Sequence, residues 1–144
     1  MTGAATRPAG GRWVRAIASG FLAELSTVLT IILIVESYRF VFRRGASDAD
    51  YAAFGAQTGA IVGVVGGAIY TYVFARLLML TLPSRFIAHG VVVALTAIAF
   101  SVAGSLAGHH GVPASYVLAS ILKLAAGVLA GVVAARRPAA PATA

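Results

Sequence analysis

The 144-residue chain has no cysteine, and only 10% of its residues are charged, against about 25% in ordinary soluble domains. Without cysteine, disulfide bonds, thiolate metal sites and cysteine nucleophiles are excluded. The shortage of charge leaves too little polar surface to cover a soluble domain of this size. Because 60% of the residues are hydrophobic, the composition predicts an integral membrane protein that forms one domain.

Acidic residues are scarce as well, so the chain carries a formal net charge of +7, with Lys123 as its single lysine. Arginines gather at the ends of apolar segments, where topology determinants and contacts with anionic lipids belong. They are Arg12, Arg15, Arg43, Arg44, Arg76, Arg85, Arg136 and Arg137. We therefore expect the lipid bilayer and anionic lipids as partners, and no nucleic acid. The excess of arginine over lysine, with abundant alanine and glycine, indicates a GC-rich bacterial genome.

Four apolar segments are long enough to cross a hydrocarbon core of about 30 Å as helices. We expect an all-α fold, an up-down bundle of four transmembrane helices at about 14–42, 56–80, 86–108 and 114–135. Residues 1–13 and 138–144 are rich in small residues and contain proline, which predicts disordered tails around a single domain at 14–137. The polar stretch 45–54 is expected to be a short connection.

Charge near the helix ends predicts the orientation of the bundle. Four spans place both termini on one side, together with the connection between the second and third helices. That side holds seven arginines and the other side three, which favours both termini in the cytoplasm of a cell inner membrane. The adjacent Arg43 and Arg44 lie on the side with fewer arginines and argue for the opposite orientation.

Glycines recur every four residues in two of the segments. Gly59, Gly63 and Gly67 form one series, while Gly127 and Gly131 share a helix face with Lys123. Such faces let the backbone of another helix come close. We expect them to mediate helix packing within the subunit, or association into a homodimer or a larger membrane complex.

Glu24 lies well inside the first segment, where a charged residue costs about 2.5–3.5 kcal/mol on the insertion scale. Lys123 lies near the middle of the fourth segment, and the first and fourth helices of an up-down bundle can be neighbours. Counted along the helices, the two residues differ in depth by about 9 Å, a gap that extended side chains and helix tilt reduce. We therefore interpret Glu24 and Lys123 as a candidate pair, direct or through water.

Two interpretations of Glu24 remain open. It is either a structural residue, ion-paired or protonated and hydrogen-bonded, or a residue that binds protons or cations in a transport cycle. His89 lies one turn inside the start of the third segment and is an interfacial histidine or a candidate proton relay beside Glu24. Glu36 has Arg39 three residues on, which predicts a local ion pair.

Catalytic and metal-binding patterns are not found in the sequence. It contains no Ser/His/Asp set, Walker loop or HExxH motif, so we expect no enzyme activity and no cofactor. His109 and His110 are adjacent in a turn and have no visible third ligand, so we predict no metal site.

The stretch Leu22–Ala23–Glu24, in the first of four spans, resembles the small multidrug resistance transporters. The resemblance implies a dimer in which Glu24 exchanges protons for a cationic drug. Lys123 is an addition to that pattern, and a mid-membrane lysine would oppose a cationic substrate. Two function classes follow. One is a structural or accessory protein that associates through its glycine faces, and the other is a small proton- or ion-coupled transporter or channel that uses Glu24.

Overall fold

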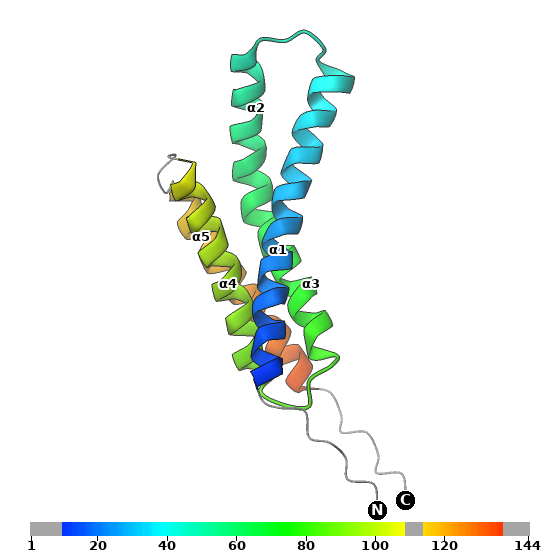
Figure 1. The fold of residues 1–144 in the computed structure, drawn as a ribbon, viewed down its shortest axis with the longest axis vertical. Helices are drawn as coiled ribbons and strands as arrows, with labels where there is room; N and C mark the ends of the chain where they lie inside the picture. The colour runs from blue at the N-terminus through cyan, green and yellow to red at the C-terminus, as the bar shows by residue number, and fades with distance from the viewer. Residues whose placement is uncertain (1–9, 109–113, 137–144) are drawn as a thin grey trace, which may run out of the picture.

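The computed structural model describes residues 10–108 and 114–136, and these residues form a bundle of helices without strands (Figure 1). Four helices in this part of the chain are long and apolar enough to cross a membrane. The predicted fold class, an all-α bundle of four transmembrane helices, is confirmed. Residues 1–9, 109–113 and 137–144 lie outside the described part, and with them His109, His110 and most of both predicted tails.

Two of the four spans are continuous rods in which α-helix and π-helix alternate. The elements are α1 (Gly10–Ser37), η1 (Tyr38–Phe42), α2 (Asp48–Ile61), η2 (Val62–Gly66), α3 (Gly67–Met79), α4 (Phe86–Ala107) and α5 (Ala114–Ala135). The first two spans are 32 residues long and the last two are 22 residues long. Accordingly, the hairpin of α1 and α2 extends past α4 and α5 at one end of the bundle (Figure 1).

The second span begins at Asp48, not near residue 56 as the sequence suggested. Ser47 and Asp50 form a capping box: the Asp50 N–H donates to Ser47 Oγ, and the Ser47 N–H donates to Asp50 Oδ2, both at 3.2 Å. Both bonds satisfy amides that a helix start otherwise leaves unpaired. Much of the predicted connection 45–54 is therefore the first turns of α2. The first helix likewise begins earlier than predicted, at Gly10.

Replacing Ser47 by alanine is expected to cost about 1 kcal/mol and to fray the first turn of α2. Amide hydrogen exchange at residues 48–51 measures the fraying. Ser37→Ala is the matched control, because Ser37 precedes η1 and its side chain makes no cap bond within the described residues. Equal exchange in the two variants would contradict the role of the capping box.

The helices pack so that α1 and α5 occupy opposite corners of the bundle. α1 packs against α3 and α4, and α5 packs against the same two helices. The expectation that the first and fourth helices are neighbours is therefore wrong. The physical reason is that α4 receives both of them closely: a side chain at Gly20 of α1 would overlap Val93 O, and one at Gly90 of α4 would overlap Gly127 O of α5.

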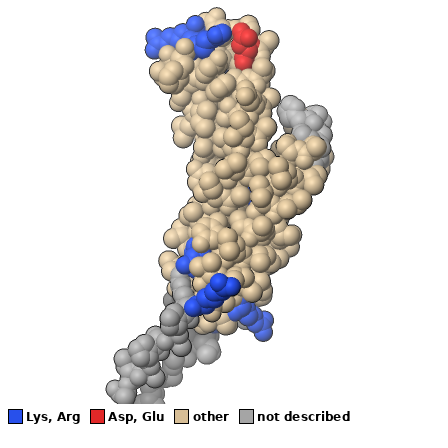
Figure 2. All heavy atoms as spheres, turned by 180° about the vertical axis from the view of Figure 1, so that it is seen from behind, with Lys and Arg blue, Asp and Glu red and all other residues tan. Residues whose placement is uncertain are grey.

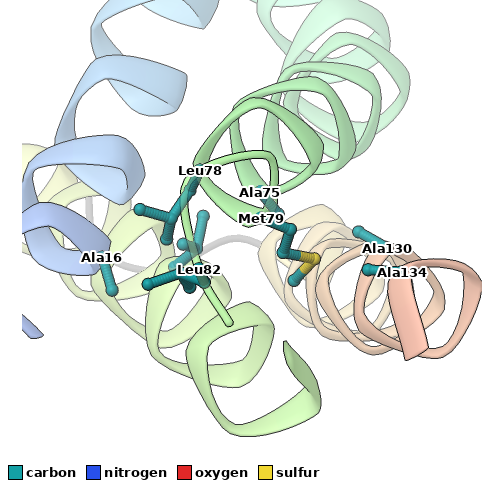
Figure 3. Close-up of a cluster of buried hydrophobic side chains, with 8 residues drawn as sticks. Ala16, Ala75, Leu78, Met79, Leu82, Ala130 and Ala134 are labelled. Carbon is teal, nitrogen blue, oxygen red and sulfur yellow. The ribbon is translucent and has the colours of Figure 1, made fainter. Parts of the chain in front are cut away.

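The packed core lies toward the end where α1 begins and α5 ends (Figure 3). Half of its members are alanines, and four larger side chains fill the remaining space. Its members are Ala16, Ala75, Leu78, Met79, Leu82, Val93, Ala130 and Ala134. Small side chains bring the helix backbones close, which is how helices associate where lipid removes the hydrophobic drive between them.

The outside of the bundle is apolar. Large side chains such as Leu33, Ile61 and Leu129 are more than half exposed along the spans. Charged side chains lie at the two ends of the face shown in Figure 2, and the middle of that face is uncharged. This surface suits contact with a lipid bilayer, as predicted from the composition.

Candidate functional site

Three helices meet at one charged cluster inside the bundle. Lys123 Nζ of α5 lies 2.6 Å from Glu24 Oε2 of α1. Ser101 Oγ of α4 donates to Glu24 Oε1 at 2.6 Å, and Lys123 Nζ also donates to Ser101 Oγ. The side chain of Lys123 is 3% exposed and that of Glu24 is 13% exposed. The structure thus brings Glu24 and Lys123 into direct contact, with Ser101 closing a triangle between them.

Glu24 is positioned by the close approach of α1 to α4 one turn earlier. Gly20 lies against Val93 and Thr96 of α4, and a side chain at Gly20 would overlap both. Ala23 and Thr27 flank Glu24 and are buried, and the Thr27 hydroxyl donates to Ala23 O at 2.9 Å. These small residues turn this face of α1 inward and carry the carboxylate into the bundle.

Lys123 reaches across the bundle because Gly67 of α3 leaves room for the aliphatic part of its side chain. A Cβ at Gly67 would lie only 2.6 Å from Lys123 Cε. The methylene chain therefore lies directly on the α3 backbone, and the ammonium group extends beyond it to α1. This extended side chain spans the diagonal of the bundle, and the depth difference of about 9 Å deduced from helix positions does not prevent direct contact.

The hydrogen bonds of the cluster leave little charge uncompensated. Glu24 accepts one bond on each carboxylate oxygen, and Lys123 donates to both Glu24 and Ser101. A buried ion pair offsets its own desolvation only when its remaining polar atoms are also hydrogen-bonded. Ser101 supplies that extra donor and acceptor. The sequence offered only a weak signal for this role, a hydroxyl near the middle of an apolar segment.

His89 lies elsewhere and is not part of this cluster. It is twelve residues before Ser101 on α4, or about 18 Å along the helix axis. Its ring stacks on Trp13, with 4.3 Å between ring centroids, and its Nδ1 lies 2.9 Å from Arg85 O. The structure therefore does not bring His89 and Glu24 together as the proposed proton relay requires.

The glycine series divide into packed and open positions. Gly127 and Gly131 lie against Gly90 and Ile87 of α4. Gly59 and Gly63 have no described atom within 4 Å of the place where a Cβ would be. The π-helical segment η2 separates them from Gly67, which packs on Lys123. A π-helical turn holds about one more residue than an α-helical turn, so it rotates Gly67 away from the face of the other two.

The predicted ion pair of Glu36 with Arg39 is not formed. The salt bridge found among the described residues is the one between Glu24 and Lys123, and it does not involve Glu36 or Arg39. The Arg39 guanidinium instead lies over the Tyr51 ring, 5.4 Å from its centroid. Arg39 belongs to the π-helical segment η1, where the three-residue spacing of an α-helix does not hold.

Two hollows are open between the described helices, and neither is lined by Glu24 or Lys123. One, of about 340 Å³, lies between α1 and α2 and is lined by residues that include Thr30, Tyr38 and Phe54. The other, of about 320 Å³, lies where α1 and α4 begin. The ion pair is therefore separate from both hollows.

These helices and their apolar surface define a four-span membrane protein. No family model, no curated protein and no solved structure matches the chain. The likeness to small multidrug resistance transporters accordingly rests on the three residues that end at Glu24.

Proposed function

We propose that this four-span protein is a structural or accessory membrane protein without enzyme activity, which associates through the glycine face of α2. Its place is a bacterial inner membrane, with both termini in the cytoplasm. The observation that carries the proposal is a contrast. The charged residues Glu24 and Lys123 of the interior are paired with each other, whereas Gly59 and Gly63 are open to a neighbour within the described structure.

The closed ion pair supports a structural role for Glu24. A carboxylate that couples transport must be reached by protons or substrate, and here Lys123 and Ser101 occupy both of its oxygens. Lys123 also supplies a positive charge at the place where a cationic substrate would need a negative one. The pair fastens α1 to α5 across the bundle, and Ser101 links both of them to α4.

The open face of α2 supports association with a second helix. Lipid does not drive helices together by the hydrophobic effect, so close contact between backbones is what stabilises a helix pair in a membrane. The simplest partner is α2 of a second copy, because a two-fold axis pairs one patch with itself. The tip of the hairpin formed by α1 and α2 carries both basic and acidic side chains (Figure 2), so two copies paired along α2 bring opposite charges within reach.

Replacing Gly59 by leucine is expected to weaken dimerisation in the membrane by about tenfold, which corresponds to about 1.4 kcal/mol. The chain has no cysteine, so a single introduced cysteine labels each copy at one place. Energy transfer between labelled copies, measured in liposomes over a range of protein-to-lipid ratios, gives the dimer fraction. Gly104→Leu is the matched control, because Gly104 is also open within the described structure but lies on α4.

Three results would overturn the proposal. One is a wild-type protein that stays monomeric at every protein-to-lipid ratio. Another is an equal loss of energy transfer in Gly59→Leu and Gly104→Leu. The third is a proton or cation flux through proteoliposomes that Glu24→Gln abolishes, which would identify the protein as a small ion-coupled transporter or channel instead.

A further inference from the structure

The hollow of about 320 Å³ at the end of the bundle has basic and aromatic residues in its lining. It is lined by Arg12 and Trp13 of α1, by Ser84 and Arg85 before α4, and by His89 of α4. Two of these five residues are arginines, and none of the described residues that line it is acidic. The first turn of α4 starts at the same place, and its N-cap, Arg85, makes no side-chain cap bond in the described structure. A helix start of this kind adds positive potential.

His89 supplies a buried polar atom that needs a partner. The residue is 3% exposed, and its ring is held by stacking on Trp13. Its Nδ1 lies 2.9 Å from Arg85 O, and because a carbonyl oxygen only accepts, Nδ1 carries the hydrogen. In the neutral ring Nε2 is then an acceptor, and it is buried without a hydrogen-bond partner among the described residues. A ligand with a hydroxyl group would satisfy Nε2 by donating a hydrogen bond to it.

The surroundings of the hollow favour a lipid as the source of that ligand. Val14 and Ile17 follow the hollow on α1, and both are large apolar side chains that are exposed. Acyl chains can lie along them while the head group enters the hollow. Trp13 is at the level where amphipathic rings anchor a protein in the membrane interface.

We propose that this hollow binds the head group of an anionic phospholipid that carries both a phosphodiester and a free hydroxyl group, as in phosphatidylglycerol. The phosphodiester oxygens pair with the guanidinium groups of Arg12 and Arg85, because charge-assisted bonds from arginine fit phosphate well. The hydroxyl group donates to His89 Nε2. Two different parts of one head group thus satisfy the two unusual features of the hollow, its charge and its buried acceptor.

Trp13 is the only tryptophan of the chain and lines the hollow, so its fluorescence reports binding directly. Full-length protein in uncharged detergent is titrated with phosphatidylglycerol, with phosphatidylmethanol, which keeps the phosphodiester but lacks the hydroxyl, and with zwitterionic phosphatidylcholine. We expect phosphatidylglycerol to bind at least fivefold more tightly than phosphatidylmethanol, and phosphatidylcholine to bind most weakly. Equal binding of phosphatidylcholine and phosphatidylglycerol would overturn the proposal.

Variants separate the two interactions. His89→Phe keeps a ring against Trp13 and is expected to make phosphatidylglycerol and phosphatidylmethanol bind equally. Arg85→Gln is expected to weaken both lipids about tenfold, which corresponds to losing one charge-assisted contact. Arg136→Gln is the matched control, because Arg136 is exposed, directly follows α5 and does not line the hollow.

The same titration decides between a lipid and a soluble phosphate. Glycerol 3-phosphate offers a phosphate and hydroxyl groups without acyl chains, and we expect it to bind at least a hundredfold more weakly than phosphatidylglycerol. Equal affinity for the two would overturn the lipid as the ligand. If His89→Phe does not fold, the comparison of Arg85→Gln with Arg136→Gln tests the site alone, and an equal effect of these two variants contradicts it.

Discussion

Replacing Lys123 by methionine is expected to lower the free energy of unfolding by about 3 kcal/mol, the lower end of the range for breaking a buried ion pair. Methionine preserves most of the aliphatic chain of residue 123 that lies on Gly67. Glu24 then keeps its negative charge inside the bundle with Ser101 as its remaining donor among the described residues. Steric trapping in bicelles, or thermal unfolding in detergent, measures the change.

The double variant is the sharper test of this pair. Glu24→Gln alone is expected to cost as much as Lys123→Met, because it leaves the ammonium group unpaired. The two changes together leave no buried charge at this place and are expected to cost less than about 1 kcal/mol. Glu36→Gln is the matched control on the same rod, since Glu36 forms no ion pair within the described residues, and it is expected to change stability by less than about 0.5 kcal/mol. Single variants as stable as wild type at neutral pH would show that the pair contributes nothing to folding.

A methyl group added at Gly90 is expected to destabilise the bundle by about 3 kcal/mol, the upper end of the usual range for overpacking. The new Cβ would overlap the carbonyl oxygen of Gly127, and the reverse change at Gly127 would overlap that of Gly90. A backbone cannot turn aside as a flexible side chain can, so α4 and α5 must separate along the packed core. The same separation would pull Lys123 away from Ser101.

Gly104→Ala on the same helix is the matched control for this prediction. A Cβ at Gly104 meets no described atom within 4 Å, so alanine is expected to be neutral or to stabilise α4 by about 0.5–1 kcal/mol. Thermal unfolding of the three proteins in one detergent measures the order. A Gly90→Ala protein that is as stable as Gly104→Ala would show that the two helix backbones are not in close contact.

The spans and their class could be predicted from the sequence because hydrophobic length alone decides them in a membrane. The ends of the helices were harder to predict from the sequence. The start of α2 depends on the capping-box hydrogen bonds between Ser47 and Asp50, within a stretch that composition alone describes as polar. A capping box is visible in the sequence as a serine followed three residues later by an acidic residue, so this signal was present.

Partners across the bundle could be predicted only in part. Glu24 and Lys123 stand out because charge is rare inside a membrane, so they could be singled out as a candidate pair. Ser101 could not, because serine is common in transmembrane helices and its role depends on how α4 is rotated. The division of the glycine series at η2 was hidden for a related reason: a four-residue spacing describes one face only while the helix stays regular.

The unequal lengths of the two hairpins have a consequence for the membrane itself. At about 1.5 Å per residue, the 32-residue rods measure about 48 Å and the 22-residue helices about 33 Å. A bilayer that matches α4 and α5 leaves about 15 Å of the longer hairpin beyond the hydrocarbon. This part of the hairpin carries Glu36, Arg39, Asp48 and Asp50, which belong among the lipid head groups or in water. The protein therefore presents a charged hairpin tip outside the hydrocarbon, on the side opposite the start of α1, where Phe40 and Phe42 are exposed beside the charges.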